Sequence, residues 1–265
     1  MLVLRPASWL VGAPIVFYSY RFGGGEDFGS LCVLSLALSF PYCFWLFGWN
    51  DYYDHESDQI NPRKRSPLYG SNRNIRDLTG IRFLLILSGV LGLALSLLLP
   101  VETAVCLLTL FGLSYFYSVP PVRLKRIPFA SALTSGLVIF LLFLAALSLG
   151  DFQVPLESYF MVPLIMSFHH IAEIIDFDAD NGGKSDTTVT MYGIEKMVLV
   201  IKFLVALCLI SICFLSYAKG IQFFILGFAS VIICFDLRML RVENRMFFSL
   251  IAAVTAISFI LLFIY

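Results

Sequence analysis

RFLLILSGVLGLALSLLLPVETAVCLLTLFGLSYFYS, residues 82–118, contains two apolar runs separated only by Pro100 and Glu102. Each run is close to the ~20 residues that a helix needs to cross the hydrocarbon core of a bilayer. A proline beside a charged residue is typical of a tight turn. We therefore expect two membrane-spanning helices, over 82–99 and 101–118, joined by a short hairpin.

The whole chain of 265 residues has the composition of an integral membrane protein. Hydrophobic residues make up 59% of it and charged residues 14%, whereas soluble domains have about 45–50% and 25%. The mean hydropathy is +0.88, which also excludes a disordered chain. The 18 basic residues balance the 18 acidic ones, and this balance argues against a protein that binds nucleic acid.

Apolar runs elsewhere in the chain predict further helices. The fold we expect is an all-α integral membrane protein, a bundle of nine transmembrane helices in a single domain over residues 1–265. The expected spans are 7–21, 29–49, 82–99, 101–118, 129–149, 157–175, 196–217, 220–237 and 246–265.

The positions of Lys and Arg predict the orientation of this bundle. With the N-terminus in the cytoplasm, nine spans place every basic residue except Arg21 and Lys219 on the cytoplasmic side. Basic residues are enriched in cytoplasmic loops. We therefore expect a multi-pass protein of the cell inner or plasma membrane, whose long polar loops, and any active site on them, face the cytoplasm.

Acidic residues cluster at the cytoplasmic end of the second expected helix. Four of the 18 lie between positions 51 and 58. If the helix continues this far, Asn50, Asp54 and Asp58 share one face, and Asp51 adjoins it. Like charges at this spacing repel each other, so a cation is expected among them. Side-chain oxygens next to an apolar bundle indicate Mg²⁺, which favours carboxylates and phosphate oxygens.

A second cluster forms a stripe along the expected helix that begins at residue 157. His169, Glu173, Asp176 and Asp180 follow each other at helical spacing. Ionisable residues at membrane depth usually face a cavity or the interior of the bundle. Asp178 is expected to be solvated, and His170 to face away from the stripe.

Basic residues follow both the first cluster and the Pro120–Pro121 pair. Carboxylates that hold Mg²⁺, with Arg and Lys nearby, suit a diphosphate group. Acidic residues beside basic ones are also common on solvated surfaces, but two clusters on one side of the membrane favour a site. The acids lie at helix ends, whereas a secondary transporter carries them near the midplane of the bilayer.

The motifs taken together resemble the UbiA superfamily of intramembrane prenyltransferases. The first family motif, NDxxDxxxD, matches residues 50–58 in full, and Y-S-x-P-P-x-R-L-K matches residues 117–125. The second motif, DxxxD, matches Asp176 and Asp180, with Thr187 at the usual offset and Gly193 at the end of the segment. This resemblance covers essentially the whole chain.

Membership of that superfamily implies a Mg²⁺-dependent transfer of a prenyl group from a prenyl diphosphate to a lipophilic acceptor, with release of pyrophosphate. The implied metal ligands are Asn50, Asp51, Asp54, Asp58, Asp176 and Asp180, and the four aspartates at 54, 58, 176 and 180 are expected to be essential for catalysis. The implied diphosphate-binding residues are Arg63, Lys64, Arg123, Lys125 and Tyr117. Glu173 or His169 is expected to accept a proton from the cationic product.

The segment 58–64 and the run Thr187–Thr190 look like the branch of the superfamily that elongates lycopene. The branches that act on quinone precursors, chlorophyll or lipids share the same metal core and stay open as alternatives. Membrane lipid surrounds such an enzyme, and the sequence indicates no obligatory protein partner.

Overall fold

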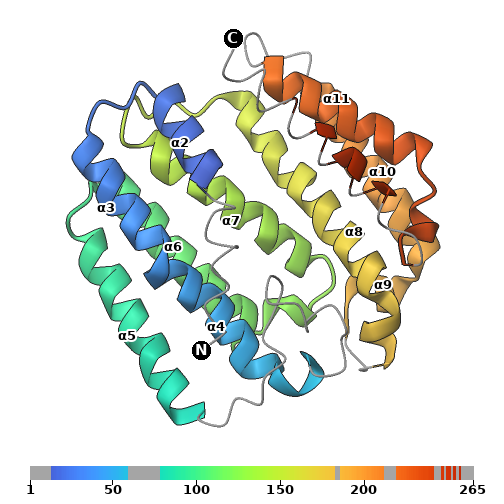
Figure 1. The fold of residues 1–265 in the computed structure, drawn as a ribbon, viewed down its shortest axis with the longest axis horizontal. Helices are drawn as coiled ribbons and strands as arrows, with labels where there is room; N and C mark the ends of the chain where they lie inside the picture. Colours follow the sequence, from blue (N-terminus) through green and yellow to red (C-terminus); the bar gives the residue numbers. More distant parts are fainter. Residues whose placement is uncertain are drawn as a thin grey trace. The chain divides into compact units, whose positions relative to one another are not determined.

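The computed structural model describes residues 13–58, 78–182, 186–211, 219–241, 246–247, 249–251, 253–254 and 257. All regular structure in these residues is helical (Figure 1). The α-helices are α2 Ala13–Phe22, α3 Phe28–Leu38, α4 Phe40–Asp58, α5 Leu78–Ser96, α6 Val101–Ser118, α7 Ala130–Leu147, α8 Met161–Gly182, α9 Thr188–Tyr192, α10 Ile194–Ser211 and α11 Lys219–Cys234. Short 3₁₀ helices are η2 Leu124–Arg126, η3 Leu156–Phe160 and η4 Leu237–Arg241.

The described helices support an integral membrane protein. Among the residues that the structure describes, four segments are long and apolar enough to cross a bilayer: Phe28–Asp54, Val101–Ser118, Ala130–Leu147 and Ser158–Gly182. Most of the last predicted span, 246–265, lies outside the described residues, as does the start of the first. The prediction of an all-helical membrane protein is confirmed at this level.

The second predicted span differs from the structure because it is broken into two helices. α3 ends at Leu38 and α4 begins at Phe40, and the backbone of Ser39 between them leaves the helical region, with ψ of −109°. Pro41 explains the break, since a proline has no N–H to donate to the carbonyl four residues earlier and its ring clashes with that carbonyl. α4 then continues to Asp58, which is the condition for Asn50, Asp54 and Asp58 to share one face.

The chain divides into two compact units. The first contains Met1–Lys125 and Leu137–Val154, and the second contains Arg126–Gly136 and Pro155–Tyr265. α7 therefore begins in the second unit and continues into the first.

In the first unit, α4 packs against α3, α5 and α6 (Figure 1). Two polar contacts fix α4 on α6: the Tyr42 hydroxyl lies 2.9 Å from Ser114 Oγ, and Trp45 Nε1 donates to the Phe111 carbonyl at 2.9 Å. Such interhelical hydrogen bonds help to hold helices together in a bilayer, where the hydrophobic effect between helices is weak.

In the second unit, α8 packs against α9, α10 and η4, and α10 packs against α11. The shared core includes Ile174 from α8, Ile201 from α10 and Phe228 from α11, all essentially buried. α8 continues without a break from Met161 to Gly182, so the predicted stripe of His169, Glu173 and the two aspartates lies on a single helix.

The contact between α5 and α6 gives a first testable prediction. Gly92 is buried, and a Cβ at this position would overlap the ring of Phe111. We expect Gly92→Ala to lower the free energy of unfolding by about 1–3 kcal/mol, because overpacking forces the ring and the helices apart. Thermal unfolding in detergent measures the change.

Gly112→Ala is the matched control, because a Cβ there meets no atom within 4 Å. Alanine is the better helix former by about 1 kcal/mol, so this variant is expected to keep or raise the unfolding midpoint. Equal midpoints for the two variants would contradict the described packing of α5 on α6.

Candidate functional site

The first unit contains a polar site at the end of α4. Asn50, Asp51 and Asp54 lie in its last turns, and Asp51 is almost completely buried, with 2% of its surface exposed. The backbone of Asp58 lies in the same helix, whereas its side chain, and Arg63 and Lys64, lie outside the described part. The side chains of Asp51 and Asp54 thus lie near the same end of a single helix, as predicted.

Two predicted diphosphate-binding cations contact these α4 residues directly. Arg123 Nη2 donates to Asp54 Oδ1 at 2.8 Å and to the Tyr53 carbonyl at 3.3 Å. The Lys125 ammonium forms an ion pair with Asp54 Oδ2 and donates to Asn50 Oδ1 at 3.2 Å. The cations expected from the repulsion between the acidic residues therefore include Arg123 and Lys125.

Arg123 and Lys125 lie in the segment that follows α6. Arg123 has a φ of 43°, a left-handed conformation that is rare for residues other than glycine and that clusters at functional sites. Its backbone N–H donates to the Val119 carbonyl at 3.1 Å, which closes the turn. Tyr117, half-buried in the last turn of α6, directly precedes this segment.

Several buried donors of this unit have no hydrogen-bond partner among the described residues. They are Trp49 Nε1, Ser118 Oγ and Arg123 Nε. Buried polar groups are nearly always satisfied in a folded protein, so each exception calls for an explanation. Trp49 precedes Asn50, and Ser118 begins the segment that ends in Lys125, so these donors flank the polar site in the sequence.

The oxygens of this site fit Mg²⁺. Asn50 Oδ1 and Asp54 Oδ2 converge on the single positive charge of Lys125, and Mg²⁺ also favours oxygen ligands. Within the described ranges, no three His, Cys, Asp or Glu side chains are grouped closely enough to hold a metal ion. Mg²⁺ is commonly bound through one or two carboxylates together with substrate phosphates, and the donor set of Asn50 and Asp54 suits that mode.

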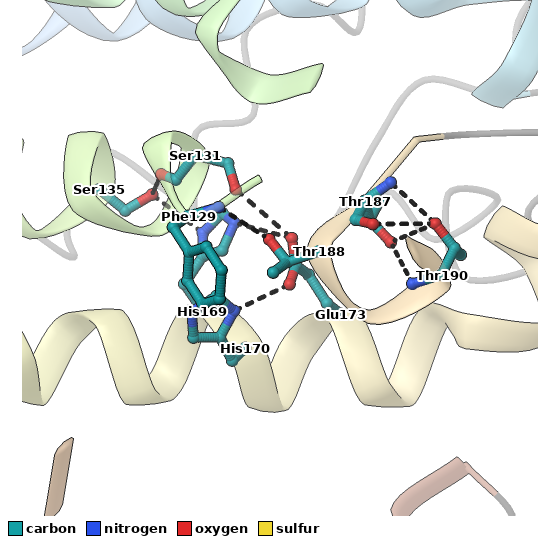
Figure 2. A network of polar contacts seen from close by, with 9 residues as sticks. All are labelled: Phe129, Ser131, Ser135, His169, His170, Glu173, Thr187, Thr188 and Thr190. Carbon is teal, nitrogen blue, oxygen red and sulfur yellow. Dashed lines mark hydrogen bonds and ion pairs between the residues drawn. The ribbon is translucent and has the colours of Figure 1, made fainter. Parts of the chain in front are cut away.

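The second unit contains a separate network of polar side chains (Figure 2). Glu173, 7% exposed, is its centre. Ser131 Oγ from α7 donates to Glu173 Oε1 at 3.4 Å, and His169 Nε2 lies 3.5 Å from the same oxygen. His169 Nδ1 lies 2.9 Å from Ser135 Oγ.

The expectation that His170 faces away from the stripe is wrong. Its Nδ1 lies 2.9 Å from Glu173 Oε2. Because the two residues are three positions apart on a helix, their side chains can meet, and His170 is completely buried. Asp178 is exposed, as predicted, while Asp176 and Asp180 are half-buried further along α8.

The segment after α8 supports the same network. Thr187 caps α9 through a reciprocal pair of hydrogen bonds with Thr190, and Gly193 ends that helix with a φ of 84°. Thr188 Oγ1 accepts from the Phe129 N–H at 3.2 Å, and the Phe129 ring packs edge-on against His170. The sequence reasoning missed Ser131 and Ser135, although their spacing of four residues at the start of an apolar span was a usable signal.

An all-helical membrane protein with a carboxylate–cation site of this kind is a candidate membrane enzyme for an anionic substrate. The sequence matches the UbiA prenyltransferase family over residues 10–246. The chain therefore belongs to the UbiA prenyltransferase family, and the prediction of a membrane prenyltransferase is confirmed.

Two archaeal relatives are both named lycopene elongase/hydratase. The protein from Haloarcula japonica is 31% identical over 194 residues, which cover 71% of this chain and 65% of its own length. The protein from Halobacterium salinarum is 26% identical over 243 residues, which cover 90% of this chain and 86% of its own length.

Solved structures share the fold. A UbiA homologue from Archaeoglobus fulgidus bound to GPP and Mg²⁺ has a TM-score of 0.78 at 20% identity, covering 99% of this chain and 97% of that chain. The same homologue bound to DMAPP and Mg²⁺ also has a TM-score of 0.78, with 96% of that chain covered.

Proposed function

We propose that this protein transfers the prenyl group of a short prenyl diphosphate such as DMAPP to the chain end of a lycopene-like acceptor, with release of pyrophosphate. The names of the two archaeal relatives support the acceptor, and the diphosphates bound by the A. fulgidus homologue support the donor. The observation that carries the proposal is the contact of Arg123 and Lys125 with Asn50 and Asp54. Buried donors that have no partner among the described residues flank these side chains in the sequence.

We further propose how the residues divide the work. Asn50, Asp51, Asp54 and Asp58 from the first motif, and Asp176 and Asp180 from the second, are the candidate ligands of Mg²⁺. When bound, Mg²⁺ supplies positive charge that stabilises the departing pyrophosphate. Arg63, Lys64, Arg123, Lys125 and Tyr117 are the candidate partners of the diphosphate oxygens.

Departure of pyrophosphate breaks the C–O bond of the donor, and the pyrophosphate keeps the electron pair, which leaves an allylic cation. The apolar helices exclude water, which would otherwise capture this cation. After the new C–C bond forms, the acceptor chain carries the positive charge. A neighbouring C–H bond then breaks, its electron pair forms the new C=C bond, and the proton passes to Glu173 or His169. This step neutralises the product without another reactant.

Removal of the Glu173 carboxylate tests the proton-accepting role. We expect Glu173→Gln to lower kcat about 100-fold, the usual order for loss of a general base. The KM for the diphosphate is expected to stay within about threefold, because no diphosphate contact is removed. Steady-state rates of pyrophosphate release give both values, and a variant with unchanged kcat would contradict the role.

The proposed topology has nine spans with the N-terminus and both acidic motifs in the cytoplasm. It is supported by the distribution of Lys and Arg, which leaves only Arg21 and Lys219 on the outside. Cysteine labelling in intact cells tests it: a single cysteine placed near Glu26 is expected to react with an impermeant reagent, and one placed near Ile127 is not. The reverse pattern would overturn the orientation.

A panel of substrates tests the proposed reaction. Purified protein in lipid nanodiscs with Mg²⁺ is incubated with donors of increasing length and with lycopene, an aromatic quinone precursor, a chlorophyll precursor or a glyceryl lipid. The proposal predicts transfer from DMAPP to lycopene. Transfer to one of the other acceptors instead would assign the protein to that branch of the family.

A further inference from the structure

The network around Glu173 contains residues to which the proposed reaction gives no role. His170 and Ser135 bind the two groups that are proposed to take the proton: His170 contacts Glu173 Oε2, and Ser135 contacts His169 Nδ1 (Figure 2). All four side chains belong to the second unit, on α7 and α8.

The hydrogen positions at His170 follow from its neighbours. A carboxylate oxygen only accepts, so the nitrogen 2.9 Å from Glu173 Oε2 must carry the hydrogen. His170 Nε2 is buried without a partner in the described part of the chain. A second hydrogen on this nitrogen would be a buried, unsatisfied donor, which is costly. His170 is therefore suited to a fixed role, in which Nδ1–H holds Oε2 and leaves Oε1 facing His169.

The neighbours of His169 suit both the neutral and the protonated form of its ring. Ser135 Oγ lies 2.9 Å from His169 Nδ1 and 3.1 Å from the Ser131 carbonyl. In a neutral ring, Nδ1–H donates to the hydroxyl, which donates to the Ser131 carbonyl, and the lone pair of Nε2 is free to take the proton. In a protonated ring, the bonds at Nδ1 are unchanged, and Nε2–H lies at ion-pair distance from Glu173 Oε1, 3.5 Å away. Ser135 therefore satisfies Nδ1 in both states.

We propose that His170 and Ser135 are positioning residues for the proton transfer, and that His169 holds the proton that leaves the product. The inference rests on the proposed prenyl transfer. His170 fixes the orientation of the Glu173 carboxylate, and the hydroxyl of Ser135 accepts from His169 Nδ1–H before and after Nε2 gains the proton. The arrangement has the logic of a histidine oriented and stabilised by a carboxylate.

The central experiment compares His170→Leu with His170→Asn. An asparagine amide can place an N–H near the position of Nδ1, whereas leucine fills the space without a donor. We expect His170→Leu to lower kcat about 30-fold with the KM for DMAPP within about threefold, and His170→Asn to recover kcat to within about fivefold of the parent protein. Ser135→Ala is expected to lower kcat about tenfold by the same reasoning.

Ser167→Ala is the matched control, because Ser167 is also buried on α8 and its hydroxyl, in the described part of the chain, bonds only to the Leu164 carbonyl of its own helix. Its kcat is expected to remain at the parent value. Equal losses in His170→Leu and His170→Asn, with both variants folded by size-exclusion chromatography and thermal unfolding, would overturn the proposal. If the parent protein releases no pyrophosphate from any donor and acceptor of the panel, the proposed function fails first. If the parent protein is active and His170→Leu leaves kcat unchanged, the proposed role of His170 is wrong and the proposed function stands.

Discussion

Asp54→Asn is expected to abolish prenyl transfer, with a fall in kcat of about 1,000-fold or more. Asp54 binds two cations of the polar site at the end of α4, because one of its carboxylate oxygens contacts Arg123 and the other contacts Lys125. Asparagine keeps the shape and loses the charge, so the site keeps its cations and loses a carboxylate that we propose as a ligand of Mg²⁺. Pyrophosphate release by the purified variant, with lycopene and DMAPP, measures the effect.

Asp27→Asn is the matched control for this change. Asp27 lies in the same unit and caps α3 by accepting from the Ser30 N–H, and the Ser30 hydrogen bonds lower the pKa of its carboxyl. Asparagine caps a helix about as well as aspartate, so this variant is expected to retain both the fold and the activity. Full activity in Asp54→Asn would show that Asp54 is not a ligand of the catalytic metal.

Arg123→Ala is expected to lower kcat/KM for the diphosphate donor about 100-fold. The guanidinium is held over Asp54 by hydrogen bonds to its carboxylate and to the Tyr53 carbonyl, so its position is fixed before substrate binds. A pre-organised cation stabilises negative charge that develops on a leaving group. Donor titrations with the purified variant separate the effect on KM from that on kcat.

Arg123→Lys should recover only part of this loss, about tenfold, because lysine has the charge but not the planar donor pair. Arg82→Ala is the control: Arg82 is exposed on α5 in the same unit, and its removal is expected to leave kcat/KM unchanged. If Arg123→Ala and Arg82→Ala behave alike, Arg123 does not bind the diphosphate.

Features that depend on helical periodicity, such as which residues share a helix, could mostly be predicted from the sequence. The acidic residues near position 54 and the stripe from His169 to Asp180 lie on continuous helices, because nothing within α4 after Pro41 or within α8 breaks the repeat. Pro41 was a signal for the break at Ser39, since a proline removes a helical hydrogen bond and clashes with the preceding turn, but the continuous apolar run favoured a single span.

The contacts between segments could not be predicted in this way. The approach of Arg123 to Asp54 depends on a turn in which Arg123 has a left-handed backbone, and no spacing rule predicts that. His170 meets Glu173 because residues three apart can be neighbours on a helix, although it was expected to face away from the stripe. The two hydroxyls of α7 reach α8 only through tertiary packing, which a single sequence does not reveal.

The most direct test measures both products of the proposed reaction in the same sample. Purified protein in nanodiscs receives lycopene, labelled DMAPP and Mg²⁺, and pyrophosphate and prenylated carotenoid are quantified in the same samples, with and without a chelator. We expect equal amounts of the two products, and neither of them after Mg²⁺ is removed. Pyrophosphate released without prenylated carotenoid, or transfer that persists without a divalent cation, would contradict the proposed Mg²⁺-dependent prenyl transfer.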